Sequence, residues 1–382
     1  MARITDLPNE LLVPIFENVW RTSPELVLAL ALSCKRLHQP ARTVYYSHVC
    51  LSWKLNRNSA LAKFASGNVG NEAVKSIRLS PQKALLSAFK VGMKNAFDHI
   101  DVLCACLSSL QNLATFSIFL GVQVDRRCLL PAPALSRIVR ALPESVVNFE
   151  LDTEGIDGIY ENKPKTPSDV HLCHDISELL PRLETLRLRV SCMCTELFRS
   201  LEPEGTHQPA SNLRLAAIKL ELYSERGVEI PNTVVNCQAQ WSGEAHRRDD
   251  VLRPTKLFDH LLRLQSKGAF PHLQRFILLS WSTQKCICIR DVASRTTTEY
   301  LCMSGRLQNN HWTPADKGED NYMIRVLGRG DYYGGSEEVA KAIMHEVAWT
   351  EEQNGARLPP SRQVVAAEHR LDTSVLQSYQ WT

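Results

Sequence analysis

The chain has 382 residues, of which 44% are hydrophobic and 22% charged, a composition typical of a globular protein with a buried core. This length allows about two domains or one elongated repeat domain. The 44 basic and 41 acidic residues are interspersed and leave a formal net charge of +3, so we expect no electrostatic attraction to nucleic acid or to an anionic membrane.

The N-terminal segment carries Arg3, Asp6 and Glu10, which argues against a secretory signal. The longest uninterrupted apolar run, Leu26 to Leu32, is far shorter than the about 20 residues of a membrane-spanning helix. We therefore expect a cytoplasmic and/or nuclear protein without a membrane partner. In that environment the 12 cysteines stay reduced and serve as small buried hydrophobes.

Two helices are predicted before residue 50. In the first, apolar residues at positions 7, 11, 12, 15, 16 and 19 follow a 3.6-residue period, with Asp6 as cap and Pro8 in the first turn. The second begins at Ser23 and Pro24 and is apolar on nearly all sides. A helical unit this small cannot bury so much apolar surface by itself, so it must pack on the following domain or on another protein.

The residues of this segment narrow these alternatives. Its two motifs are Leu7-Pro8-x-Glu10-Leu11-Leu12-x-x-Ile15-Phe16-x-x-Val19 and Leu28-x-Leu30-x-Leu32-Ser33-Cys34-Lys35-Arg36-Leu37. Residues 6 to 50 thereby resemble the F-box family, and the exit from Val44 to Val49 is similar to the ending of fungal members. The segment departs from the family pattern at Pro14, inside the first helix, and at Leu37, where many members carry an aromatic residue.

The resemblance implies a small helical bundle that binds the Skp adaptor of a cullin-based ubiquitin ligase. It assigns the adaptor face to candidates of which some must pack inside the bundle: Leu7, Pro8, Leu11, Ile15, Phe16, Leu28, Leu32, Cys34 and Leu37.

The middle of the chain contains an internal repeat with the pattern apolar-x-x-apolar-x-apolar, where x is any residue. Each copy predicts a short strand. The copies are Val74/Ile77/Leu79, Leu113/Phe116/Ile118, Val146/Phe149/Leu151, Leu183/Leu186/Leu188, Leu215/Ile218/Leu220 and Leu273/Phe276/Leu278. Helices are expected between them at 83–110, with a break near Asp98, and at 132–142, 169–180 and 255–267.

This alternation predicts an α/β fold with a parallel sheet and right-handed crossovers. The strand motif resembles the leucine-rich repeat, which implies a curved solenoid, although the repeats are longer than usual and lack the asparagine or cysteine of that family. A generic α/β domain with parallel strands is the alternative. An F-box followed by leucine-rich repeats is a common architecture of the family.

The predicted organisation is an F-box over 1–50, a linker over 51–70 and a repeat domain over 71–281 that contains an inserted loop at 224–253. Strands are expected at 286–289 and 322–327 and a helix at 336–349, which together form a C-terminal α/β cap over 282–355. Residues 356–382 are expected to form a tail.

Two features could carry chemistry. The glycine-rich segment 328–336 lies between an expected strand and an expected helix, as a phosphate-binding loop would, but it lacks the third glycine of a dinucleotide fingerprint and any Gly-Lys-Ser/Thr. We interpret it as a strand-to-helix turn. Cysteine pairs at 104/106, 192/194 and 286/288, with His171-x-Cys173-His174, do not match the usual spacing of zinc ligands.

We therefore expect no metal, no cofactor and no catalytic residue. The leading hypothesis is a non-enzymatic substrate-recognition subunit of a Skp–cullin–F-box ubiquitin ligase, which binds the adaptor through its N-terminal helices and an unidentified target through its repeat domain. A non-degradative scaffold is the first alternative. A nucleotide-binding enzyme that uses the loop 328–336 is the second.

Overall fold

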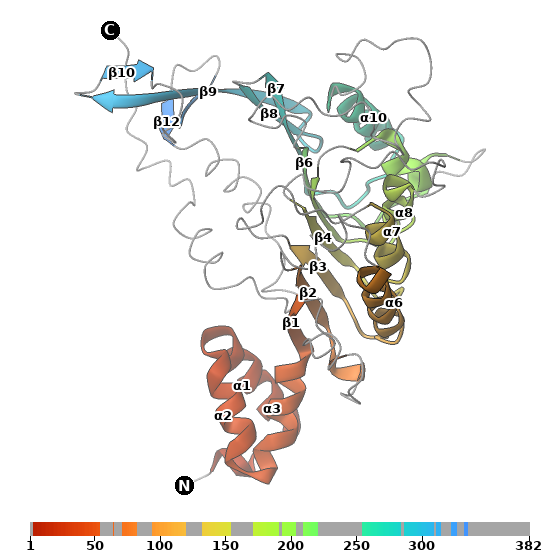
Figure 1. Ribbon diagram of the computed structural model, residues 1–382, viewed down its shortest axis with the longest axis vertical. Coiled ribbons are helices and arrows are strands. Elements are labelled where there is room, and N and C mark those ends of the chain that lie inside the picture. Colours follow the sequence, from red (N-terminus) through yellow and green to blue (C-terminus); the bar gives the residue numbers. More distant parts are fainter. Residues whose placement is uncertain are drawn as a thin grey trace.

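The computed structural model places a small helical bundle at one end of a long sheet, and the helices between the sheet's strands lie along one of its sides (Figure 1). The predicted α/β class with a mostly parallel sheet is confirmed. Among the described helices, none is long and apolar enough to cross a membrane. The structure describes residues 3–53, 64, 71–81, 94–119, 132–153, 171–190, 193–203, 209–220, 254–283, 286–308, 311–314, 322–326 and 332–334.

The bundle consists of a short 3-10 helix η1 (Ile4–Asp6) and the helices α1 (Asn9–Thr22), α2 (Pro24–Ser33) and α3 (Lys35–Ser47). Asp6, expected to cap the first helix, lies in η1, where its carboxylate accepts a hydrogen bond of 2.9 Å from the Arg3 backbone N–H. The helix α1 runs through the exposed Pro14 without ending there. The three helices bury one apolar core between them: Leu12, Phe16, Val27, Ala31, Leu37, Ala41 and Val44.

The sheet begins with parallel strands that neighbour one another in chain order. They are β1 (His48–Trp53), β2 (Ser76–Pro81), β3 (Thr115–Phe119), β4 (Asn148–Asp152), β5 (Thr185–Val190), β6 (Leu215–Leu220) and β7 (Arg275–Thr283). The described helical segments between them are η2 (Asn71–Ala73), α6 (Lys94–Ser108), α7 (Ala132–Arg140), α8 (Leu172–Ser177), η3 (Thr195–Leu201) and α10 (Pro254–Ser266).

Most of the expected elements are present, but several of their bounds differ, and α3 and η3 were not expected. The strand β1 crosses the expected F-box boundary at residue 50, because the chain leaves α3 directly into the sheet. The helix α6 continues through Asp98, where a break was expected, and α8 is shorter than the predicted 169–180. The expected linker 51–70 begins inside β1, and its residues 54–63 and 65–70 lie outside the described residues, as does the inserted loop 224–253.

One face of the parallel sheet packs against the helices. Equivalent positions on neighbouring strands carry Ile77, Phe116, Phe149, Leu186, Ala216 and Phe276, all buried in the same core as the apolar side chains of α6, α7, α8 and α10. In β6, Ala216 pairs with Leu186 of β5. The repeat copy that was assigned to Leu215/Ile218/Leu220 is therefore wrong by two residues, because an alanine at the central position hides the apolar pattern that starts at Leu213.

Alternate residues of a strand point to opposite sides, and on β2 to β5 the opposite face of the sheet carries mainly polar side chains. Arg78, Ser117, Glu150 and Arg187 occupy equivalent positions on β2 to β5 and are all buried. The Ser117 hydroxyl donates a hydrogen bond to the Glu150 carboxylate, and the Arg187 guanidinium lies 3.4 Å from its other oxygen. One hydrogen bond and one ion pair, both to Glu150, thus connect β3, β4 and β5 on this face.

After β7 the same sheet continues with antiparallel strands at its far edge (Figure 1). They are β8 (Cys286–Asp291), β9 (Thr296–Gln308), β10 (His311–Pro314), β11 (Tyr322–Val326) and β12 (Tyr332–Gly334). The strands expected at 286–289 and 322–327 are confirmed. The expected helix 336–349 and the tail 356–382 lie outside the described residues.

The glycine-rich segment differs from its prediction. Tyr332–Gly334 forms β12, which pairs antiparallel with β11 and places Ile324 opposite Tyr333. The described part of the segment 328–336 therefore lies along the preceding strand, whereas a phosphate-binding loop would lead from a strand straight into a helix. The strand β12 thus occupies part of the segment that was interpreted as a strand-to-helix turn.

Candidate protein-docking surface

Among the residues whose exposure the structure describes, large hydrophobic side chains are exposed mainly on the helical bundle. Among the described residues, the sheet domain exposes Val102 on α6, and the other members of this group lie before residue 33. We call these the bundle surface, which consists of Ile4, Leu11, Ile15, Leu26, Leu28 and Leu32. Single exposed leucines are ordinary, but a group of them on one small unit is typical of a surface that another molecule covers.

Helix geometry aligns four of these side chains in two pairs. Leu11 and Ile15 are four residues apart on α1, and Leu28 and Leu32 are four residues apart on α2, so each pair lies on one face of its helix. The side chain of Leu32 is 76% exposed and that of Leu11 is 52% exposed. From Leu26 to Cys34 the chain carries no charged residue, so α2 offers an apolar contact area with little polar surface to desolvate.

Arg36 holds the N-terminal segment in place. From the first turn of α3, its Nη2 donates a 2.6 Å hydrogen bond to the Leu7 carbonyl, and its Nη1 donates one of 2.9 Å to Asn9 Oδ1. These bonds fix the turn that carries Leu7 and Pro8 at the start of α1. This role was not expected from the sequence, because the neighbouring Lys35 carries the same charge and nothing distinguishes Arg36 from it.

The structure divides the nine predicted adaptor-face residues into three groups. Pro8, Leu11, Ile15, Leu28 and Leu32 are exposed, and Leu7 and Cys34 are partly buried. Phe16 and Leu37 lie inside the bundle core, so they support the surface from behind and are not available as contacts. Ile4 and Leu26 are also exposed but were not among the predicted residues. Ile4 lies in η1, before the first predicted helix, whereas α2 is apolar on nearly all sides and does not show from its sequence which side faces outward.

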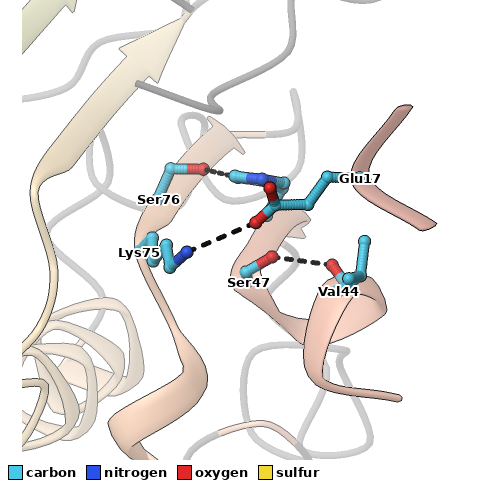
Figure 2. Close-up of polar contacts among 6 residues, drawn as sticks. Glu17, Val44, Ser47, Lys75 and Ser76 are labelled. Carbon is cyan, nitrogen blue, oxygen red and sulfur yellow. Dashed lines mark hydrogen bonds and ion pairs between the residues drawn. The ribbon is translucent and has the colours of Figure 1, made fainter. Parts of the chain in front are cut away.

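The bundle is joined to the sheet by short polar contacts as well as by the chain itself. The Lys75 backbone N–H donates a 2.9 Å hydrogen bond to the Ser47 carbonyl, and Lys75 Nζ lies 3.4 Å from Glu17 Oε1 of α1. Figure 2 shows this ion pair beside two hydrogen bonds. The Ser47 hydroxyl donates one to the Val44 carbonyl, and the other joins Ser76 Oγ to His48 Nδ1. The ion pair is partly exposed and adds at most about 1 kcal/mol, so the direct passage from α3 into β1 is the main connection.

Phe16 lies in the bundle core and the neighbouring Ile15 is exposed, so the same substitution should have different effects at the two positions. Replacing Phe16 by alanine should lower the free energy of unfolding of the bundle by about 3–5 kcal/mol, because a fully buried aromatic ring leaves a cavity. The matched change at the neighbouring Ile15, whose side chain is 37% exposed, should cost less than about 1 kcal/mol. Hydrogen–deuterium exchange of peptides from α1 to α3 measures both changes, and equal protection in the two variants would contradict the assignment.

No family model matches this sequence, and no curated protein matches it either. Its function is therefore inferred from its own residues.

Proposed function

We propose that this chain is the substrate-recognition subunit of a Skp–cullin–F-box ubiquitin ligase, in which α1 to α3 form an F-box that binds the Skp adaptor. The observation that carries this proposal is the bundle surface, with Leu11 and Ile15 exposed on α1 and Leu28 and Leu32 on α2. The resemblance of residues 6–50 to the F-box family names a partner for that surface.

Each fully exposed leucine that a partner buries contributes about 1.5–3 kcal/mol, so a few of them can drive a stable association. A permanent interface of this kind resembles a protein core cut in half. The apolar stretch of α2 suits such an interface, because covering it leaves no charge unpaired.

For the rest of the chain we propose a degenerate leucine-rich-repeat domain that presents the target. Its support is the run of parallel strands in chain order, with helices packed on one face. The chemistry of ubiquitin transfer is supplied by the other subunits of the ligase, and this chain contributes binding.

The experiment is co-expression of the full chain with the Skp adaptor, followed by size-exclusion chromatography with light scattering. We expect a stable complex with one copy of each protein. Absence of a complex at about 10 µM of both proteins, far above the affinity of a permanent partner, would refute the proposal.

A second readout separates a ligase subunit from a scaffold. The complex, supplied with the cullin, the RING subunit and ubiquitin-charging enzymes, should transfer ubiquitin to a protein bound by the sheet domain. A scaffold would bind the adaptor but support no transfer to any bound protein. Deleting residues 1–50 is a poor control, because the cut falls inside β1, so surface substitutions are preferable.

A further inference from the structure

A histidine and two cysteines meet inside the sheet domain. His171 is the residue that precedes α8, and Cys173 lies in the first turn of α8. Cys194 comes after strand β5 in the sequence and directly precedes η3. His171 Nε2 lies 3.2 Å from Cys194 Sγ, although the two residues are 23 positions apart in the sequence. The ligand atoms of all three residues lie within 4.8 Å of one another.

The arrangement differs from an ordinary packing of buried cysteines. Cys173 and Cys194 are both buried in the apolar core of the sheet domain, and His171 is partly buried beside them. The His171 side chain does not cap α8, the usual task of a polar residue at this position, and it is directed to a sulfur atom instead. The start of α8 and the start of η3 thus bring an imidazole nitrogen and two thiol sulfurs close together.

The distances and the charges suit zinc. In a tetrahedral site with Zn–N of about 2.0 Å and Zn–S of about 2.3 Å, neighbouring ligand atoms are about 3.5 Å apart. Side-chain rotations that move the three ligand atoms by about 1 Å would bring them to these distances around one ion. Two thiolates and one neutral imidazole cancel the charge of Zn²⁺. A neutral site is what an apolar surrounding requires, because an uncompensated buried charge is costly.

We propose that His171, Cys173 and Cys194 bind one zinc ion, with water in the fourth coordination position, and that the ion ties the start of α8 to the start of η3. The three ligands come from two segments that are adjacent only in the fold. The expectation of no metal site followed from sequence spacing, which does not show that β5 brings Cys194 back to His171 and Cys173. This site is separate from the bundle surface, so its test is independent of adaptor binding.

The test measures metal in the full chain purified from zinc-supplemented medium and then substituted with Co²⁺. We expect one zinc per chain and, with Co²⁺, a thiolate charge-transfer band together with the visible bands of a tetrahedral ion. Each of the variants Cys173→Ser, Cys194→Ser and His171→Gln should lose the bands and bind metal at least about 100-fold more weakly. Cys106→Ser, which changes another buried cysteine of the same domain, should behave as wild type.

A measurement on the unmodified chain guards against variants that fail to fold. Removing the metal with a chelator should lower the Tm of the wild type, and adding zinc should restore it, because binding to the folded state alone stabilises that state. A purified chain without stoichiometric zinc, Co²⁺ bands that survive in folded Cys194→Ser, or a Cys173–Cys194 disulfide found by mass spectrometry would each overturn the proposal.

Discussion

Replacing Leu11 and Leu32 together by aspartate should abolish binding of the chain to the Skp adaptor, with an affinity at least about 1,000-fold lower. Both side chains belong to the bundle surface and are among its most exposed members. In the proposed complex they would be buried, so each aspartate would place a carboxylate in an apolar contact and cost at least about 2 kcal/mol. Isothermal titration calorimetry with the purified adaptor measures the loss.

The same substitutions should leave the fold intact, which separates a lost contact from a lost structure. Neither side chain is part of the bundle core, so the free energy of unfolding should change by no more than about 0.5 kcal/mol per substitution. Val102→Asp is the matched control, since Val102 is 45% exposed but lies on α6 of the sheet domain. Adaptor binding by the double variant within tenfold of wild type, or an equal loss with Val102→Asp, would contradict the assigned surface.

Replacing Glu150 by alanine should lower the free energy of unfolding of the sheet domain by about 3–5 kcal/mol. Glu150 and Arg187 are both buried on neighbouring strands, with Arg187 Nη1 3.4 Å from Glu150 Oε1. Alanine removes the carboxylate that faces this guanidinium and the acceptor of the Ser117 hydroxyl, while the positive charge stays buried. Urea unfolding followed by circular dichroism measures the change.

Two further variants test the cause of this loss. The double variant Glu150→Leu/Arg187→Met should recover most of the stability, because apolar side chains of similar volume replace a buried ion pair at little cost. The exposed pair of Asp101 with Arg137 is the control, and Asp101→Ala should change the stability by less than about 1 kcal/mol. A loss in Asp101→Ala as large as in Glu150→Ala would show that burial is not the cause.

The two predictions concern different ends of the molecule and can fail separately. Loss of the Glu150 carboxylate acts on the sheet domain, whereas the bundle has its own apolar core. Adaptor binding should therefore persist in Glu150→Ala under conditions in which the bundle stays folded. A variant of this kind would retain the adaptor and lose the target, which is a useful reagent for separating the two proposed binding functions.

Local patterns in the sequence determined much of the fold. The helices α1, α2, α7 and α10 and the strands β2 to β5 lie where apolar periodicity and capping residues placed them, because these signals act within one or two turns of the chain. The same patterns indicated an apolar face on the first helix. Leu11 and Ile15 follow from that period, and both are exposed.

The tertiary structure decided what depends on contacts between distant segments. It placed β1 in the sheet through its pairing with β2, set the register of β6 at Ala216, and turned the glycine-rich segment back onto β11. Phe16 and Leu37 lie in the bundle core, and Cys194 lies next to His171 although β5 separates them in the sequence. A sequence pattern shows which side chains are apolar or can bind a metal, but which of them meet is decided only when the strands and helices pack together.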